Sequence, residues 1–115
     1  MKSSEIRLSV DRSDEGIESI RWQADEAPVP GEQEARAMLL ALWDPEARNA
    51  MRIDLWTQEM TVQEMNEFLF QTLMSLADTY QGATRNQALA AEMKIFAREF
   101  VEKAVKAEAE GSRQS

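Results

Sequence analysis

The sequence predicts an α+β fold: an antiparallel four-stranded sheet of two β-hairpins, followed by an antiparallel helical hairpin packed on one face of the sheet. Three observations predict it. Near the amino terminus, apolar and polar residues alternate in two segments, as in half-buried strands. Two further segments between residues 38 and 56 pair as a hairpin with one wholly apolar face. From Val62 onwards, apolar residues follow the helical period of 3.6 residues.

The first hairpin comes from the two alternating segments. Every second residue is apolar in Glu5–Asp11, and again between Ile20 and Ala24. Pairing residues whose numbers have an even sum gathers the apolar side chains on one face: Ile6, Leu8, Ile20 and Trp22. The connecting segment Asp11–Gly16 partly resembles a calcium loop, but its twelfth position is Trp22 rather than Glu, so an ordinary polar turn is predicted.

The third strand has two interpretations. Asp25–Gly31 contains two prolines and a glycine, which exclude a regular element, and we interpret it either as a crossover between two hairpins or as a loop along a sheet edge. The next segment, Gln33–Trp43, is rich in helix formers. Pairing it with residues 50–56 at a constant residue-number sum of 93 nevertheless opposes large side chains to small ones, which favours a strand. A helix from about Glu32 to Trp43, replacing the third strand, is the alternative.

The register of the second hairpin gives it two different faces. The wholly apolar face is predicted to meet the helices and carries Met38, Leu40, Leu42, Met51, Ile53 and Leu55. The other face carries Leu39, Trp43, Arg52, Asp54 and Trp56. We expect Asp44 to open the connecting turn before Pro45, and Asp54 to pair with Arg52 two positions away on the same face.

The helices are predicted from their end signals. Thr61 and Glu64 form a capping box that starts the first helix, and Gly82 is expected to end it in the left-handed conformation. Thr84 is expected to start the second helix, whose apolar stripe is Leu89, Met93, Phe96, Phe100 and Ala104. The tail from about residue 107 to 115 has few apolar residues and is expected to fray. We interpret the 115 residues as a single domain.

The composition argues against many functions. The sequence has no cysteine, the usual thiol nucleophile, and no histidine, the usual proton shuttle near neutral pH. These two residues are also the usual zinc ligands. Its formal charge of −8 argues against binding to nucleic acid or anionic membranes. Neither a signal peptide nor a membrane span is evident, so we expect a cytoplasmic protein. We therefore predict that the protein is not an enzyme, with no catalytic residue, cofactor or metal.

The second hairpin instead suggests protein binding. Two tryptophans and an arginine on one exposed face are the composition of an interface. We predict a contact patch formed by Leu39, Trp43, Arg52, Asp54 and Trp56. A patch of this kind is uncommon on a monomer, so we expect protein partners and a homo-oligomer.

Several short motifs resemble one known family. They are Leu42-Trp43-Asp44, Met51–Thr57, Glu59–Met65, Gln71-Thr72-Leu73 and Ala77–Tyr80. With these motifs the chain resembles the gliding motility-associated GldC family, over nearly its whole length to about Phe100. The resemblance implies a small accessory protein with partners among motility or envelope-assembly components. It implies no reaction and no catalytic residue.

A second similarity concerns architecture alone. Four antiparallel strands followed by two helices, in a small acidic protein, resemble the export chaperone SecB. A chaperone-like protein that binds unfolded clients is therefore the alternative function.

Overall fold

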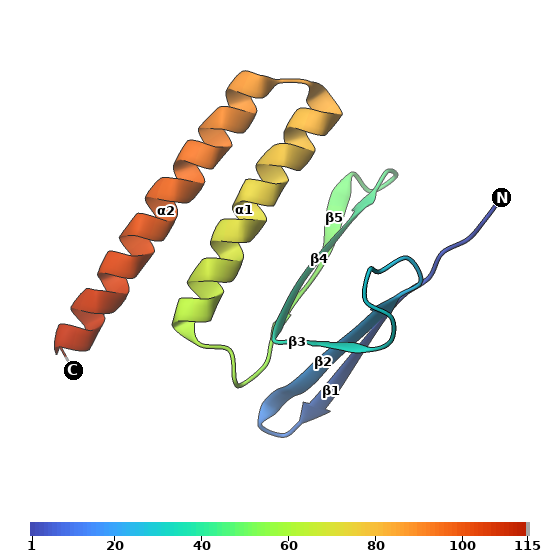
Figure 1. The fold of residues 1–115 in the computed structure, drawn as a ribbon, viewed down its shortest axis with the longest axis horizontal. Coiled ribbons are helices and arrows are strands. Elements are labelled where there is room, and N and C mark those ends of the chain that lie inside the picture. Colours follow the sequence, from blue (N-terminus) through green and yellow to red (C-terminus); the bar gives the residue numbers. More distant parts are fainter. Residues whose placement is uncertain (115) are drawn as a thin grey trace. The chain divides into compact units, whose positions relative to one another are not determined.

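The protein, in a computed structural model that describes residues 1–114, consists of five strands followed by two helices (Figure 1). The elements are β1 (Ile6–Ser13), β2 (Gly16–Ala24), β3 (Gln33–Ala35), β4 (Ala37–Asp44), β5 (Asn49–Trp56), α1 (Val62–Thr84) and α2 (Gln87–Gln114). They fall into two compact units, which divide between Met60 and Thr61. The predicted α+β class is confirmed, but the single four-stranded sheet is wrong: the strands form one sheet of three and one of two.

The three-stranded sheet has the order β1-β2-β3 and is antiparallel. Its first hairpin pairs residues whose numbers have an even sum, as predicted, from Ile6 to Asp11, with Leu8 opposite Trp22. The hairpin is longer than expected, because a bulge after Asp11 lets pairing continue to Ser13 and Gly16. Gly16 has φ of +131°, a conformation that favours glycine and permits this short turn.

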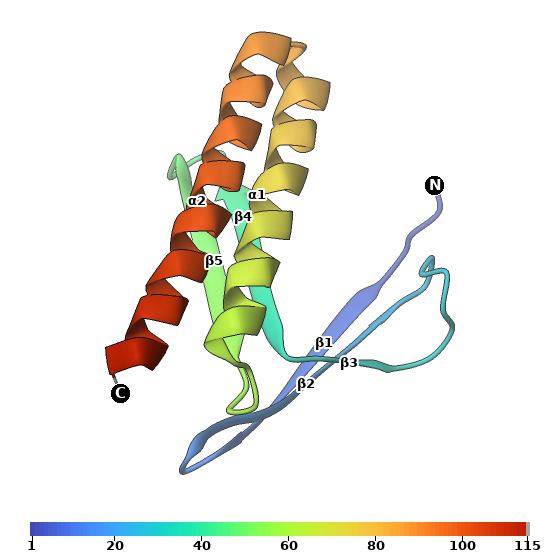
Figure 2. The ribbon, with the colours of Figure 1, turned by 60° about the vertical axis from the view of Figure 1, so that its left-hand side comes forward.

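The segment expected to be the third strand is in fact two strands. Residues Gln33–Ala35 pair with β2, and after a bend at Arg36 the chain continues as β4 in the other sheet (Figure 2). The helical alternative for this segment is therefore wrong. Of the two interpretations of Asp25–Gly31, the crossover between hairpins is wrong, because this segment connects β2 and β3, neighbouring strands of one sheet. The loop along a sheet edge stays a prediction. A strand of three residues is too short to show the alternation from which strands are predicted.

The two-stranded sheet, which we call the β4–β5 ribbon, has the predicted register throughout. Met38 lies opposite Leu55, Leu42 opposite Met51, and every other pair also sums to 93. The structure therefore confirms the pairing that was inferred from opposing large and small side chains.

The first helix begins as predicted and ends later. Thr61 Oγ1 accepts a hydrogen bond from Glu64 N at 3.0 Å, and the Glu64 carboxylate accepts one from Thr61 N, which confirms the capping box. Gly82 does not end the helix. Instead α1 continues to Thr84, and the left-handed position is taken by Arg85 with φ of 63°. Arg85 N donates a hydrogen bond to the Gln81 carbonyl, one of the last carbonyls of the helix. This hydrogen bond offsets the steric cost of the left-handed conformation.

The second helix starts two residues later than Thr84. Asn86 Oδ1 accepts a hydrogen bond from Leu89 N at 3.0 Å, so Asn86 rather than Thr84 caps α2. The Thr84 hydroxyl is already occupied, because it donates to the Tyr80 carbonyl within α1.

The contact between the two helices is formed by small side chains. Among the described residues of this unit, the fully buried apolar ones are alanines: Ala77, Ala90 and Ala97. The apolar stripe predicted on α2 is wrong at two of its positions, since Leu89 and Phe96 are exposed. The buried face is rotated by one residue towards Ala90 and Ala97, which let the helix backbones approach closely, and Lys94 pairs with Asp78 across the hairpin at 2.8 Å.

Two further expectations remain predictions. The first is that the helical hairpin packs on a sheet face to make a single domain, which depends on how the two units are arranged. The second is that the tail frays from about residue 107, which is a prediction about motion. The helix α2 extends through this tail to Gln114, and Ser115 lies outside the described residues.

Candidate protein-contact surface on the β4–β5 ribbon

One face of the β4–β5 ribbon carries all five residues predicted to form a contact patch. We call this face, formed by Leu39, Trp43, Arg52, Asp54 and Trp56, the Trp face. Its two tryptophans are 61% and 58% exposed, although large aromatic side chains are normally well buried. Arg52 and Asp54 are exposed as well, and Leu39 is half-buried.

The pairing across the ribbon explains the shape of the Trp face. Trp43 stands opposite Ala50, and Trp56 stands opposite Ala37, so each indole lies beside a small side chain. The two tryptophans occupy rungs at opposite ends of this face, about 20 Å apart at roughly 3.4 Å per residue along a strand. The two rings therefore lie at opposite ends of the Trp face, with the rungs of Arg52 and Asp54 between them.

A charged pair fills the middle of the Trp face. Arg52 Nη2 donates to Asp54 Oδ1 at 2.7 Å, which confirms the predicted pair. Both side chains are exposed, so this ion pair contributes little to stability. It does fix a guanidinium and a carboxylate between two aromatic rings, and such groups can exchange hydrogen bonds with a partner at the centre of an interface.

The turn beside Trp43 is rigid for a reason visible in the sequence. The Asp44 carboxylate accepts hydrogen bonds from Glu46 N at 2.9 Å and Ala47 N at 3.2 Å, while its carbonyl accepts one from Arg48 N. Asp44 therefore opens the turn as predicted, and its carboxylate is engaged in holding the backbone.

The opposite face of the ribbon also carries exposed apolar side chains. They are Leu42, Met51 and Ile53, on the face that is predicted to meet the helices. In the described part of the chain, no third strand pairs with β4 or β5. The ribbon thus has open backbone edges in addition to its side-chain faces, and open edges are sites where another strand can pair.

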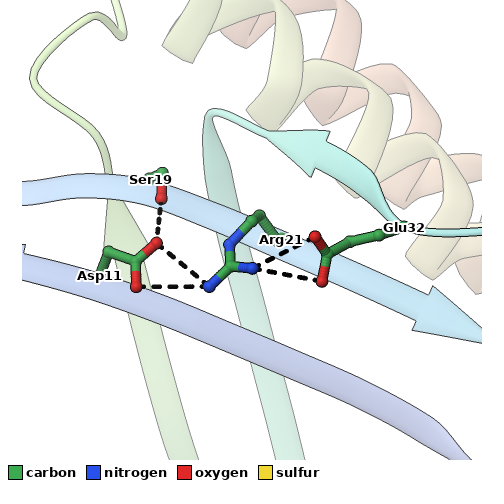
Figure 3. Close-up of polar contacts among 4 residues, drawn as sticks. All are labelled: Asp11, Ser19, Arg21 and Glu32. Carbon is green, nitrogen blue, oxygen red and sulfur yellow. Dashed lines mark hydrogen bonds and ion pairs between the residues drawn. The ribbon is translucent and has the colours of Figure 1, made fainter.

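Charged side chains cluster on the three-stranded sheet, where they pair with one another, although Arg21 Nε is buried without a hydrogen-bond partner among the described residues. Figure 3 shows Arg21 between Asp11 and Glu32, with Ser19 donating to Asp11 at 2.6 Å. The hydrogen bond from Ser19, and then the charge of Arg21, lower the pKa of Asp11 from its ordinary value. Each carboxylate has a partner, so we assign the network to holding the strands together.

The described residues offer two further observations about possible sites. They contain no group of three or more His, Cys, Asp or Glu side chains arranged to hold a metal ion. Within the same range, no helix combines the length and the apolar character needed to cross a bilayer.

Comparison with known families identifies the chain. A family model described as "Gliding motility-associated protein GldC-like" matches residues 17–106, which includes most of the two units. The chain belongs to the GldC-like family. This confirms the resemblance inferred from the motifs, and the GldC-like match contains every residue of the Trp face. No curated protein and no solved structure matched the chain.

Proposed function

We propose that this GldC-like chain is a non-catalytic accessory protein that binds other proteins through the Trp face, in the gliding-motility system named in its family description. The observation that supports the proposal is the exposure of Trp43 and Trp56 on one face of a two-stranded ribbon. Exposed tryptophans flanking an arginine are the residues that dominate binding energies at protein interfaces. The proposed setting is the cytoplasm, with motility or envelope-assembly components as partners.

The composition of the ribbon also supports self-association. A two-stranded ribbon is marginally stable by itself and gains stability from a covering layer. One face is apolar, the other carries two exposed tryptophans, and a helical hairpin can cover at most one of them. A second copy of the chain, or a protein partner, could cover the other. We therefore propose a homo-oligomer or an obligate complex as the working form.

The experiment is an affinity pull-down from the source cells, followed by native mass determination of the captured complex. It uses the wild-type chain, the double variant Trp43→Ala/Trp56→Ala, and Leu42→Ala/Ile53→Ala on the opposite face. The proposal predicts that the tryptophan variant alone loses its partner or its second copy. The site assignment is wrong if that variant captures the same complex as the wild type.

A chaperone-like function is the second candidate, because exposed apolar side chains are not confined to one patch. They occur on the ribbon and on both helices, including Leu76, Leu89 and Phe96. Phe96 and Phe100 stack with ring centroids 6.4 Å apart beside a hollow of about 330 Å³. Dispersed apolar surface suits binding to unfolded chains. Failure to slow the aggregation of several unfolded test proteins, at equimolar amounts or above, would exclude this function.

A further inference from the structure

A cavity of about 370 Å³ lies in the first unit, where two segments attach to strand β2. Strand β3 pairs with residues Ile20 to Trp22 of β2. Nearer the start of β2, the Ile17 carbonyl accepts a hydrogen bond from Gln58 N at 3.3 Å. The cavity lies between these two attachments. The residues that matter for its chemistry come from β2, β3, the bend after β3 and the segment after β5: Glu18, Ile20, Glu34, Arg36, Thr57 and Glu59.

Thr57 lines this cavity, and its buried hydroxyl has no hydrogen-bond partner among the described residues. The whole residue is only 4% exposed. Its backbone N–H is satisfied by the Arg36 carbonyl at 2.8 Å, so only the side chain is left unpaired. Buried polar groups are nearly always paired, and a cavity of this size is many times larger than the roughly 30 Å³ occupied by one water molecule. The hydroxyl therefore points to a ligand.

The charge around the cavity selects a cation. Three carboxylates line it, from Glu18, Glu34 and Glu59, against the single guanidinium of Arg36. Arg36 lies 3.9 Å from Glu59, a loose pair whose carboxylate can still accept hydrogen bonds from a ligand. An anion would meet three negative groups, whereas an N–H cation would meet several acceptors.

The acceptors fit an organic cation better than a metal ion. The carboxylates do not form a metal-binding group anywhere in the described range. The Glu18 carboxylate already accepts hydrogen bonds from Gln58 Nε2 at 3.1 Å and from Ser13 Oγ, and Glu59 is held only by its loose pair with Arg36, so Glu34 and Glu59 have more capacity for a ligand. A volume of several hundred Å³ accommodates a side-chain-sized group.

We propose that this cavity binds an organic cation, a guanidinium or a primary ammonium group. Thr57 Oγ1 accepts one N–H of the cation, and the carboxylates of Glu34 and Glu59 neutralise its charge. The ligand is either a basic side chain of a protein or a free amine, which share this chemistry. The proposal is independent of the Trp face, because the cavity contains none of its residues.

The test is a titration of the full chain followed by the NMR signals of its backbone amides. The probes are N-acetyl-arginine amide, N-acetyl-lysine amide and the diamine putrescine, with neutral N-acetyl-glutamine amide and inorganic phosphate as controls. We expect saturable shifts at Ile20, Ala35 and Thr57 with at least one cation and with neither control. Binding by the capped amino acids identifies a protein side chain as the source, and binding by putrescine alone identifies a free amine.

Matched variants distinguish this site from general attraction to an acidic protein. Glu34→Gln/Glu59→Gln is expected to weaken binding about tenfold, as for the loss of a charge-assisted hydrogen bond. The control Glu15→Gln/Glu46→Gln removes the same charge from two turns outside the cavity and should bind as the wild type does. Thr57→Val, which retains the branched shape, should also weaken binding. The proposal fails if no cation gives a saturable shift, if phosphate binds instead, or if both double variants bind equally.

Discussion

The unpaired hydroxyl of Thr57 allows a prediction about stability that runs against the usual effect of core substitutions. Thr57→Val replaces the hydroxyl with a methyl group of similar size and keeps the side chain branched. A buried hydroxyl without a partner costs about 1–3 kcal/mol, so its removal should stabilise the folded state. Because Thr57 lines a cavity, a small shift of its side chain would let the hydroxyl reach water, so we expect the lower end, about 1 kcal/mol, or a rise in Tm of roughly 4 °C.

The assay follows tryptophan fluorescence during urea unfolding. Trp22, Trp43 and Trp56 all lie before Met60, so this signal reports on the first unit alone. The variant should raise the urea midpoint and leave the slope m unchanged. The matched control Thr57→Ser keeps the hydroxyl and loses a buried methyl, and should cost about 1 kcal/mol.

Two results would refute the reasoning. A destabilised Thr57→Val together with a nearly neutral Thr57→Ser would mean that the hydroxyl has a partner in the free protein. The second result concerns the difference in unfolding free energy between Thr57→Val and the wild type. Saturating N-acetyl-arginine amide should stabilise the wild type and reduce that difference, so an unchanged difference would contradict the reasoning.

Three further predictions concern other parts of the chain. The hydrogen bond from Ser19 is the main cause of the lowered pKa of Asp11. The stability that this shift contributes is present at higher pH and is lost as pH falls below the ordinary pKa of 3.8. Asp11→Asn should therefore weaken the fall in stability at acid pH, measured by tryptophan fluorescence. Thr61→Ala removes the helix cap and should cost about 1 kcal/mol, seen as earlier thermal loss of helical circular dichroism. Ala97→Leu overfills the closely packed contact between the helices and should destabilise the helical hairpin by about 1–3 kcal/mol. Chemical unfolding followed by circular dichroism measures this loss, and the control Phe96→Ala, at the exposed neighbouring position, should cost less.

The β4–β5 ribbon shows what the sequence can predict well. Its register is local, since Leu42 and Met51 are only a turn apart, and a one-residue slip would exchange the two faces. The positions of Trp43 and Trp56 on one face follow from that register alone. For the same reason the capping box at Thr61 was predicted correctly, because it depends on four consecutive residues.

The errors lie where several local solutions compete or where the answer depends on distant residues. Gly82 and Arg85 were both available to end α1, and the hydrogen bond that Leu89 N donates to Asn86 Oδ1 decided the start of α2. The burial of Ala97 in place of Phe96 depends on how closely two helices approach, which the apolar period does not encode.

The cavity beside Thr57 could not be predicted for a related reason. It combines residues of β2, β3 and the segment after β5, and β3 itself was too short to be recognised. The sequence gives Thr57 no distinguishing mark, because a threonine between a strand and a helix is common and its burial depends on how the chain folds around it.

The central claim, that the Trp face is the surface through which the protein binds, is tested most directly by comparing the two faces of the ribbon. The measurement is the native mass of the complex formed by the wild type, Trp43→Ala/Trp56→Ala and Leu42→Ala/Ile53→Ala at equal concentration. We predict that the tryptophan variant shifts to the mass of the free chain, while the opposite-face variant keeps the mass of the wild-type complex. A tryptophan variant with the wild-type mass, or a loss of the complex only in the opposite-face variant, would contradict the claim.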